Sequence, residues 1–191
     1  MLFDPTQFDF TRQFEANWEP IRDEFLGLGR NILDIHRTYS HGAYWKLLKS
    51  NNGWMRSWQV GSTEPNGDWL TYGLCYKSEF PDEAFEQFPA TAGLLQAMGK
   101  AVVVAGFSLL KGPTFILPHW HPELGGYRLT YHLGIQAIPG RCYLNVEGEF
   151  AEEREQKSII FDGSREHFAI NLSHEERVVL YIEFDRHRLH E

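Results

Sequence analysis

The second half of the chain, from residue 101 onward, is a succession of short strand-like segments, and this pattern restricts the fold more than any other feature. Gly, Pro, Asn and Asp separate the segments, which read AVVVAGFSLL, TFILPHW, GYRLTYHLGIQ, CYLNVEGEF, SIIFDG, HFAINLS and RVVLYIEF. Short strands with turn residues between them are typical of an antiparallel sandwich or barrel. We therefore expect a mainly β fold.

The first hundred residues have a different pattern. Apolar residues at spacings of three and four predict helix near residues 14–25, and ATAGLLQAMG predicts a short helix that ends at Gly99. The segments NGWMRSWQVGS and GDWLTYGLCYK are rich in aromatic residues and bounded by turn residues, as expected of strands or of a ligand-binding rim. We expect residues 43–76 to form a rim that selects the substrate.

No repeat, low-complexity tract or Gly/Ser linker divides the sequence. We therefore expect one domain over residues 1–191. Residues 1–100 would supply helical support and the aromatic substrate rim, and residues 101–191 would form the metal-binding β core.

Composition excludes several classes of partner. The formal net charge is −8 and no basic face is visible, which argues against nucleic acid as a partner. The first twenty residues lack the pattern of a secretory signal, and no apolar run approaches the roughly 20 residues that span a bilayer. We expect a cytoplasmic protein with no membrane contact, in which Cys75 and Cys142 are reduced structural thiols.

Alternation along the strands places several polar side chains in one cavity. In GYRLTYHLG, the residues Arg128, Thr130 and His132 share one strand face, and apolar or aromatic residues share the other. The same rule places His119 and His121 on one side of HWH. Polar side chains on one face, opposite an apolar face, predict a polar cavity inside the sandwich or barrel.

Histidines on neighbouring strands of such a cavity are typical of a metal site, and imidazole suits Fe, Zn, Cu and Ni. Further along the chain, His167 is followed ten residues later by Arg177. Arg177 lies on the face opposite to the apolar residues of RVVLYIEF, so it faces the cavity and needs an anion. A histidine ligand followed by a carboxylate-binding arginine at this spacing is the layout of iron oxygenases that use 2-oxoglutarate.

Residues 67–186 resemble the aspartyl/asparaginyl β-hydroxylase family. The resemblance rests on GDWLTYGLCY, FPATAGLL, SLLKGPTFILPHWHP, YRLTYHLGI, IIFDGSREHFAIN and ERVVLYIEFDR, in that order and spacing. It implies a double-stranded β-helix of the jelly-roll or cupin-like kind with N-terminal helices packed on it. It also implies Fe(II) as the cofactor, with 2-oxoglutarate and O2 as cosubstrates.

The resemblance also assigns roles to particular residues. It makes His119 and His167 iron ligands, and it makes Arg177, with Ser108 beside it, the partner of the distal carboxylate of 2-oxoglutarate. It implies that His132 hydrogen-bonds the proximal carboxylate, and that Arg128 faces the substrate or the cosubstrate.

Three positions depart from the family pattern. Thr130 stands where the family has a second arginine, and Gly163 stands where vertebrate members have a second Asp. His121 stands where members have Asp or Gly, so two alternatives remain open: it is a third metal ligand, or it hydrogen-bonds Asp162 or Glu123. The loss of one arginine argues against an Asp side chain as the substrate.

Together these features predict an Fe(II)- and 2-oxoglutarate-dependent dioxygenase that hydroxylates an unactivated carbon of a soluble substrate. The substrate would be an amino acid, a carrier-tethered amino acid, a peptide or another small molecule. One alternative is a metal cupin, either a dioxygenase or an isomerase, that works without 2-oxoglutarate, since HWHPE and HFAIN resemble cupin metal motifs. Another is a non-catalytic barrel that binds a ligand.

Overall fold

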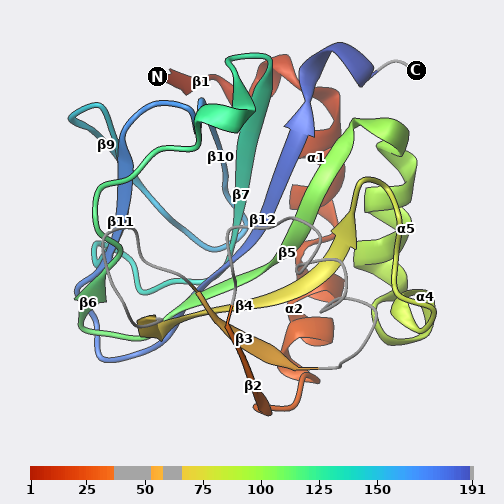
Figure 1. Cartoon of the computed structure of the whole chain (residues 1–191), viewed down its shortest axis with the longest axis horizontal. Helices are drawn as coiled ribbons and strands as arrows, with labels where there is room; N and C mark the ends of the chain where they lie inside the picture. The colour runs from red at the N-terminus through yellow and green to blue at the C-terminus, as the bar shows by residue number, and fades with distance from the viewer. Residues whose placement is uncertain (37–52, 58–65, 190–191) are drawn as a thin grey trace.

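Two β-sheets form the centre of the computed structural model, which describes residues 1–36, 53–57 and 66–189 (Figure 1). The larger sheet has the strand order β1-β10-β7-β12-β5-β4-β3-β2, and the smaller sheet has the order β6-β11-β8-β9. The strands are β1 Leu2–Phe3, β2 Ile32–His36, β3 Trp54–Ser57, β4 Asn66–Tyr76, β5 Val102–Leu110, β6 Thr114–Phe115, β7 Arg128–Gln136, β8 Cys142–Val146, β9 Glu149–Glu152, β10 Ser158–Phe161, β11 His167–Asn171 and β12 Arg177–Asp185.

The strands from β5 onward are distributed between the two sheets. β5, β7, β10 and β12 lie in the larger sheet, whereas β6, β8, β9 and β11 lie in the smaller one. The pairings among these strands are antiparallel. This arrangement is a double-stranded β-helix, and the expectation of a mainly β, jelly-roll-like core is confirmed.

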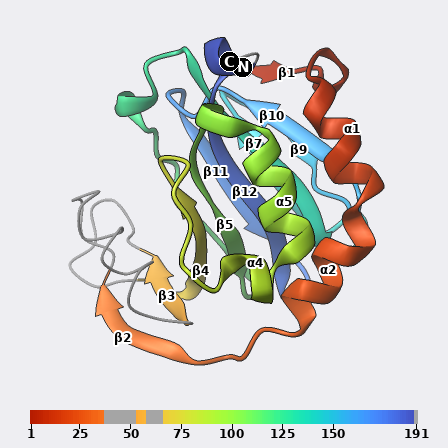
Figure 2. The ribbon, with the colours of Figure 1, turned by 90° about the vertical axis from the view of Figure 1, so that its right-hand side faces the viewer.

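Helices cover one face of the larger sheet (Figure 2). They are α1 Asp9–Ala16, α2 Trp18–Leu26, α4 Ala84–Gln87 and α5 Pro89–Ala97, with short 3-10 turns η1 Pro5–Gln7, η2 Gly99–Ala101, η3 Pro122–Leu124 and η4 Arg186–Arg188. The helical periodicity near residues 14–25 belongs to two helices that meet at Asn17. Pro20 contributes to this break, because it has no N–H to donate to the carbonyl four residues earlier.

Strands β7 and β12 separate the hydrophobic core from the cavity. One face of β12 carries Val178, Leu180, Ile182 and Phe184, all fully buried in the cluster that includes Phe14 and Phe25 of the helices. The opposite face carries Arg177 and Tyr181, which line the cavity between the sheets. The predicted alternation therefore holds on β12. On β7 it turns Leu129, Tyr131 and Leu133 into the core and His132 into the cavity. Arg128 and Thr130 do not line this cavity, contrary to the expectation.

The segment TFILPHW does not form the full strand that the sequence predicts. Only Thr114–Phe115 pair as β6, and a single bridge joins His119 to His167 further along. Pro113 and Pro118 contribute to this result because neither has an N–H for a strand ladder. Trp120 is nevertheless exposed while His119 is buried, so the expected inside–outside alternation holds without a strand.

The strands expected in the aromatic part of the first half are present as β3 and β4. The substrate rim expected over residues 43–76 falls partly on residues 43–52 and 58–65, which lie outside the described residues. Among the described helices, none has the length and apolar character needed to cross a bilayer.

Candidate metal centre and its pocket

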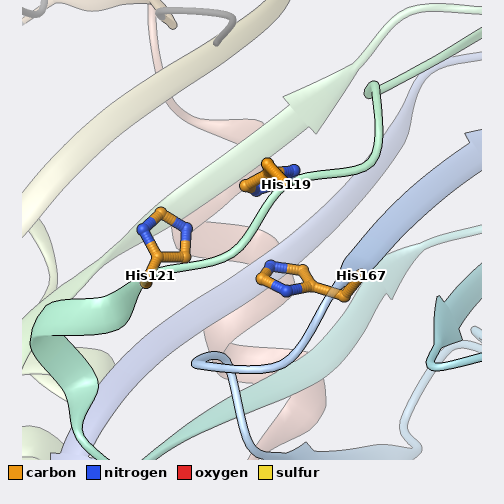
Figure 3. A group of neighbouring side chains, drawn as sticks. All are labelled: His119, His121 and His167. Atoms are coloured by element: carbon orange, nitrogen blue, oxygen red, sulfur yellow. The ribbon is translucent and has the colours of Figure 1, made fainter.

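His119, His121 and His167 come together in the cavity wall, and Figure 3 shows their imidazole rings gathered around a common space. The ring centroids lie 4.3 Å apart for His119 and His167, 5.1 Å for His119 and His121, and 5.5 Å for His121 and His167. One nitrogen of each ring lies within 4.8 Å of the others, a spacing from which the three could hold one metal ion.

Backbone hydrogen bonds position the three histidines. The N–H of His119 donates to the carbonyl of His167 at 3.0 Å, and the N–H of His167 donates to the carbonyl of His119 at 2.9 Å. The N–H of His121 donates to the carbonyl of Gly163 at 2.9 Å. The segment that carries His119 and His121 is therefore attached to the start of β11, although it forms no strand of its own.

Hydrogen bonds to backbone carbonyls also orient two of the rings. Nδ1 of His119 lies 2.8 Å from the carbonyl oxygen of Leu117, and Nδ1 of His167 lies 2.8 Å from that of Arg165. A carbonyl only accepts, so each Nδ1 carries the proton and each Nε2 retains a lone pair that can bind a metal.

Burial, followed by the neighbouring His119, lowers the pKa of His167 to about 2. The ring is therefore neutral at ordinary pH, which is the form that binds a metal.

His121 lies in the cluster and also contacts an acidic residue. Its Nδ1 lies 3.3 Å from a carboxylate oxygen of Glu123. Asp162, the other expected partner, instead accepts hydrogen bonds from the backbone and hydroxyl of Ser164 at 2.9 and 2.6 Å. An imidazole has two nitrogens, so a bond to Glu123 is compatible with metal binding through the other one.

The three histidines share a cavity of about 50 Å³ with residues that the sequence assigns to a cosubstrate. Ser108, His132 and Arg177 line the same cavity. Strand alternation predicted this position for His132 and Arg177, and the family resemblance implied it for Ser108. The Ser108 hydroxyl accepts a hydrogen bond from Nε1 of Trp69 at 3.1 Å, and the Trp69 ring lies 5.9 Å from that of His119. The remaining walls are mainly apolar or aromatic: Val104, Ile116, Leu144, Phe161, Ala169 and Tyr181.

Arg177 is fully buried, and its anion is a carboxylate of the chain itself. Nε of Arg177 donates to Oε2 of Glu153 at 2.6 Å, and Nη2 donates to Oε1 of the same side chain. Arg177 and Glu153 are each 1% exposed. Burial alone would raise the pKa of Glu153, but the charge of Arg177 and hydrogen bonds from His132 and Arg177 outweigh burial and lower the pKa to about 2. The pair is therefore ionised.

His132 belongs to the same network. Its Nδ1 lies 3.0 Å from Oε1 of Glu153, and burial lowers its pKa, so the ring is neutral. An ionised carboxylate only accepts, so Nδ1 carries the single ring proton and Nε2 is an acceptor. In this state His132 has no second N–H for a cosubstrate carboxylate.

Thr130 and Gly163, two of the positions that depart from the family pattern, lie against each other. A Cβ added at Gly163 would fall 2.7 Å from the Thr130 hydroxyl oxygen and 2.7 Å from Cδ1 of Leu124. Thr130 is buried, and its hydroxyl has no hydrogen-bond partner among the described residues. The two positions are therefore in steric contact, because in this structure even a Cβ at residue 163 would crowd the Thr130 hydroxyl.

Arg128 lies at the start of β7, on the same strand face as Thr130 and His132. Its guanidinium lies 5.4 Å from the centroid of the Tyr127 ring, and its Nε has no hydrogen-bond partner among the described residues. Arg128 does not line the cavity that holds the histidines. Its assignment to the substrate or cosubstrate stays a prediction.

Sequence reasoning missed Glu153 and Tyr181. Glu153 lies in the run EEREQK, which is typical of a solvent-exposed hairpin, and no local pattern distinguishes it from its charged neighbours. Tyr181 was open to prediction, since it lies four residues after Arg177 on the same face of β12. Both residues reach the cavity network from parts of the chain that the histidine motifs do not include.

The fold and the site define a double-stranded β-helix with a histidine cluster suited to a metal. The family model described as aspartyl/asparaginyl beta-hydroxylase matches residues 15–187, and the chain belongs to this family. The aspartyl/asparaginyl beta-hydroxylase of Homo sapiens is 26% identical over 161 residues, and that of Mus musculus is 25% identical over 163 residues. Each match includes 83% of this chain, which spans only 19% of the length of either relative.

Solved structures with similar folds include a predicted oxalate decarboxylase from Thermotoga maritima, with 12% identity and a TM-score of 0.42. That alignment covers 62% of this chain and 82% of the other. The cupin domain of Cnp3 from Schizosaccharomyces pombe has 8% identity and a TM-score of 0.43, and its alignment covers 68% of this chain and 73% of the other.

Proposed function

We propose that the chain is an Fe(II)- and 2-oxoglutarate-dependent dioxygenase that hydroxylates an unactivated carbon of a soluble substrate. One observation carries the proposal: the His119, His121 and His167 cluster shares its cavity with Ser108, His132 and Arg177. Family membership supports the same chemistry, since the matching relatives are named as hydroxylases.

The donor set fits a first-row divalent metal. Imidazole nitrogens suit iron as well as zinc, copper or nickel, and the neutral state of His167 meets the requirement that a ligand be deprotonated. When bound together with 2-oxoglutarate and O2, Fe(II) supplies an oxidant strong enough to hydroxylate a carbon that lacks activating groups. His119 and His167 would hold the metal, with His121 as the third ligand.

The chain's own residues would orient the reactants and limit the access of water. Ile116, Leu144 and Phe161 form apolar walls around the histidines, and a water-poor cavity strengthens the electrostatic interactions inside it. Ser108 and Arg177 would receive the far carboxylate of the cosubstrate. His132 and Arg177 offer the N–H donors for such a ligand, although in this structure both hold Glu153.

The substrate class follows from Thr130. A hydroxyl at this position replaces the about five N–H donors that an arginine would supply, so a substrate carboxylate would be poorly neutralised there. We therefore propose a free or carrier-tethered amino acid, a short peptide or another small molecule as the substrate. An Asp side chain of an epidermal-growth-factor-like domain is not expected to react.

The test is succinate formation. The protein is incubated with Fe(II), 2-oxoglutarate and O2, and His119→Ala serves as the inactive control. Wild-type protein should release succinate above the level of this control, faster when a true substrate is added, and that substrate should gain one oxygen in mass. Succinate release at the control level for every compound in a broad screen would contradict the proposal.

A second candidate function is a metal cupin, either a dioxygenase or an isomerase, that works without 2-oxoglutarate. The observation in its favour is that Glu153 already satisfies Arg177 and His132, so these residues have a role in the absence of any cosubstrate. Metal-dependent turnover of a substrate without succinate release would identify this function. Ligand binding with no turnover would instead indicate a non-catalytic barrel.

A further inference from the structure

Glu153 has an unusual place in the fold. It directly follows β9, and its backbone N–H donates to the carbonyl of Cys142 on β8 at 2.9 Å. Arg154 and Glu155, the next two residues, are exposed, whereas Glu153 is turned fully inward. A single carboxylate from a charged surface segment therefore lies inside the cavity network.

The Glu153 carboxylate accepts hydrogen bonds from two side chains at once, Arg177 and His132. It accepts hydrogen bonds from Nε and Nη2 of Arg177, the paired donors with which an arginine grips a carboxylate. It also accepts the only ring proton of His132. These are the two donors that the proposed function assigns to the carboxylates of the cosubstrate.

The charges explain why Glu153 and a carboxylate ligand compete. Glu153 is ionised and, through its paired hydrogen bonds, cancels the positive charge of Arg177. A ligand carboxylate that approached Arg177 with Glu153 still in place would meet a neutral pair and the repulsion of a like charge. Without Glu153, the same guanidinium would be a buried charge that lacks a counter-ion and favours any anion that reaches it.

We propose, resting on the proposed function, that Glu153 is a resident competitor for the carboxylate of the cosubstrate. It holds Arg177 and His132 in the ligand-free site, and a dicarboxylic ligand binds by exchange with it. The affinity for the ligand then reflects the difference between two binding free energies, that of the ligand carboxylate for Arg177 and that of Glu153 for Arg177. Glu153 thereby sets how much dicarboxylate the protein needs before its site fills.

The test compares the binding of 2-oxoglutarate and glutarate by wild-type protein, Glu153→Gln and the control Glu155→Gln. Glu155→Gln removes the same charge from an exposed neighbour of Glu153. Zn²⁺ replaces iron so that no turnover occurs. Calorimetry reports binding, and so does the intrinsic tryptophan fluorescence, to which Trp69 in the cavity wall contributes.

We expect Glu153→Gln to bind both dicarboxylates roughly 5- to 150-fold more tightly than wild-type protein, and Glu155→Gln to match wild type. An amide cannot neutralise the guanidinium, so the ligand would take over that role. Equal or weaker binding by Glu153→Gln would overturn the proposal and make Glu153 an anchor that positions Arg177. Absence of binding to both proteins would overturn it as well.

A second pair of variants protects the test against misfolding. Glu153→Asp retains the charge but shortens the side chain by a methylene, so it should loosen the grip on Arg177 and tighten ligand binding by less than Glu153→Gln does. The double variant Glu153→Gln with Arg177→Gln should lose the gain. Tight dicarboxylate binding by this double variant would overturn the proposal. If Glu153→Gln fails to fold, a Glu153→Asp variant that binds dicarboxylates no more tightly than wild-type protein would also overturn it.

The succinate assay separates this proposal from the proposed function. If Glu153→Gln binds glutarate more tightly but wild-type protein makes no succinate, the competition stands and the use of 2-oxoglutarate falls. If wild-type protein makes succinate and Glu153→Gln gains no affinity, the proposed function stands and the competitor role falls.

Discussion

His119 and His167 donate their backbone N–H groups to each other's carbonyl oxygens, at 3.0 and 2.9 Å. This reciprocal pairing places the two imidazole rings side by side, with centroids 4.3 Å apart. Each ring is then fixed by a second bond from Nδ1 to the carbonyl two residues earlier in its own segment. The backbone therefore prepares this pair for a metal.

The first prediction concerns this pair. His119→Ala and His167→Ala should each abolish measurable binding of Fe(II) or Zn²⁺. Each change removes one of the two imidazoles that the backbone positions for the metal, and the remaining ligands are too few to hold it. Metal content after dialysis measures the effect. The control is His174→Ala, which removes an exposed histidine and should leave metal content unchanged. Full metal loading of His167→Ala would place the metal elsewhere.

The second prediction decides between the two roles of His121. As a third ligand, His121 is replaceable by a carboxylate, so His121→Asp should retain metal and His121→Ala should lose it. As a partner of Glu123 only, either change should cost about 10- to 100-fold in affinity through lost orientation. Glu123→Gln isolates the loss of the 3.3 Å contact. Equal affinities in His121→Asp and His121→Ala would show that His121 does not bind the metal.

The third prediction concerns stability. Arg177→Met leaves Glu153 as a buried charge with no partner and should lower the free energy of unfolding by about 3–5 kcal/mol. Arg177→Met combined with Glu153→Gln should cost less than the sum of the two single changes, since neither charge then remains. Urea unfolding of all four proteins gives the coupling. Simple additivity would mean that the pair does not form in solution.

The fourth prediction follows from the pKa of His167, which falls from its usual 6.5 to about 2 in the folded protein. In the unfolded chain His167 takes up a proton as the pH falls below about 6.5, whereas in the folded chain it stays unprotonated until a much lower pH. Stability from this group is therefore full above pH 6.5 and is lost as the pH falls, at about 1.4 kcal/mol per pH unit.

Urea unfolding of the metal-free protein at pH 6.5, 5.5 and 4.5 measures this loss. His167→Gln should show a flatter decline because glutamine does not titrate, whereas His174→Gln should follow the wild type. A decline in His167→Gln as steep as in the wild type would assign the acid sensitivity to other groups.

The fifth prediction concerns Thr130, whose buried hydroxyl has no hydrogen-bond partner among the described residues. Thr130→Val retains the shape and removes the unpaired hydroxyl, so the free energy of unfolding should stay level or rise by about 1 kcal/mol. Gly163→Ala should instead destabilise by about 1–3 kcal/mol, because its Cβ would meet the hydroxyl and Leu124. Thermal unfolding checks both, and a strongly destabilised Thr130→Val would reveal a hidden partner.

The alternation of side chains made much of this fold and site predictable. In RVVLYIEF the period of two placed Arg177 toward the cavity and Val178 and Leu180 in the core, and β12 does both. His119 and His121 lie in the same cluster, as the alternation predicted, and Trp120 between them is exposed. Such inferences need only the local geometry of a strand.

The partner of Arg177 was not predictable in the same way. The sequence indicated that a buried arginine needs an anion, but the distance along the chain from Glu153 to Arg177 carries no signal. The four residues that follow Glu153, from Arg154 to Lys157, are charged or polar and exposed, whereas Glu153 is buried. Tertiary structure alone selects one carboxylate from such a run.

The measurement that tests the account most directly is an anaerobic titration of the Fe(II)-loaded protein with 2-oxoglutarate, followed by visible absorption. Binding of both should produce a weak charge-transfer band that neither component gives alone, and Arg177→Ala should shift its midpoint to a higher 2-oxoglutarate concentration. Arg177→Lys should recover only part of the affinity, because lysine cannot form the paired hydrogen bonds. A protein that binds Fe(II) at the three histidines but develops no band at saturating 2-oxoglutarate would contradict the assignment of this site to a 2-oxoglutarate-dependent hydroxylase.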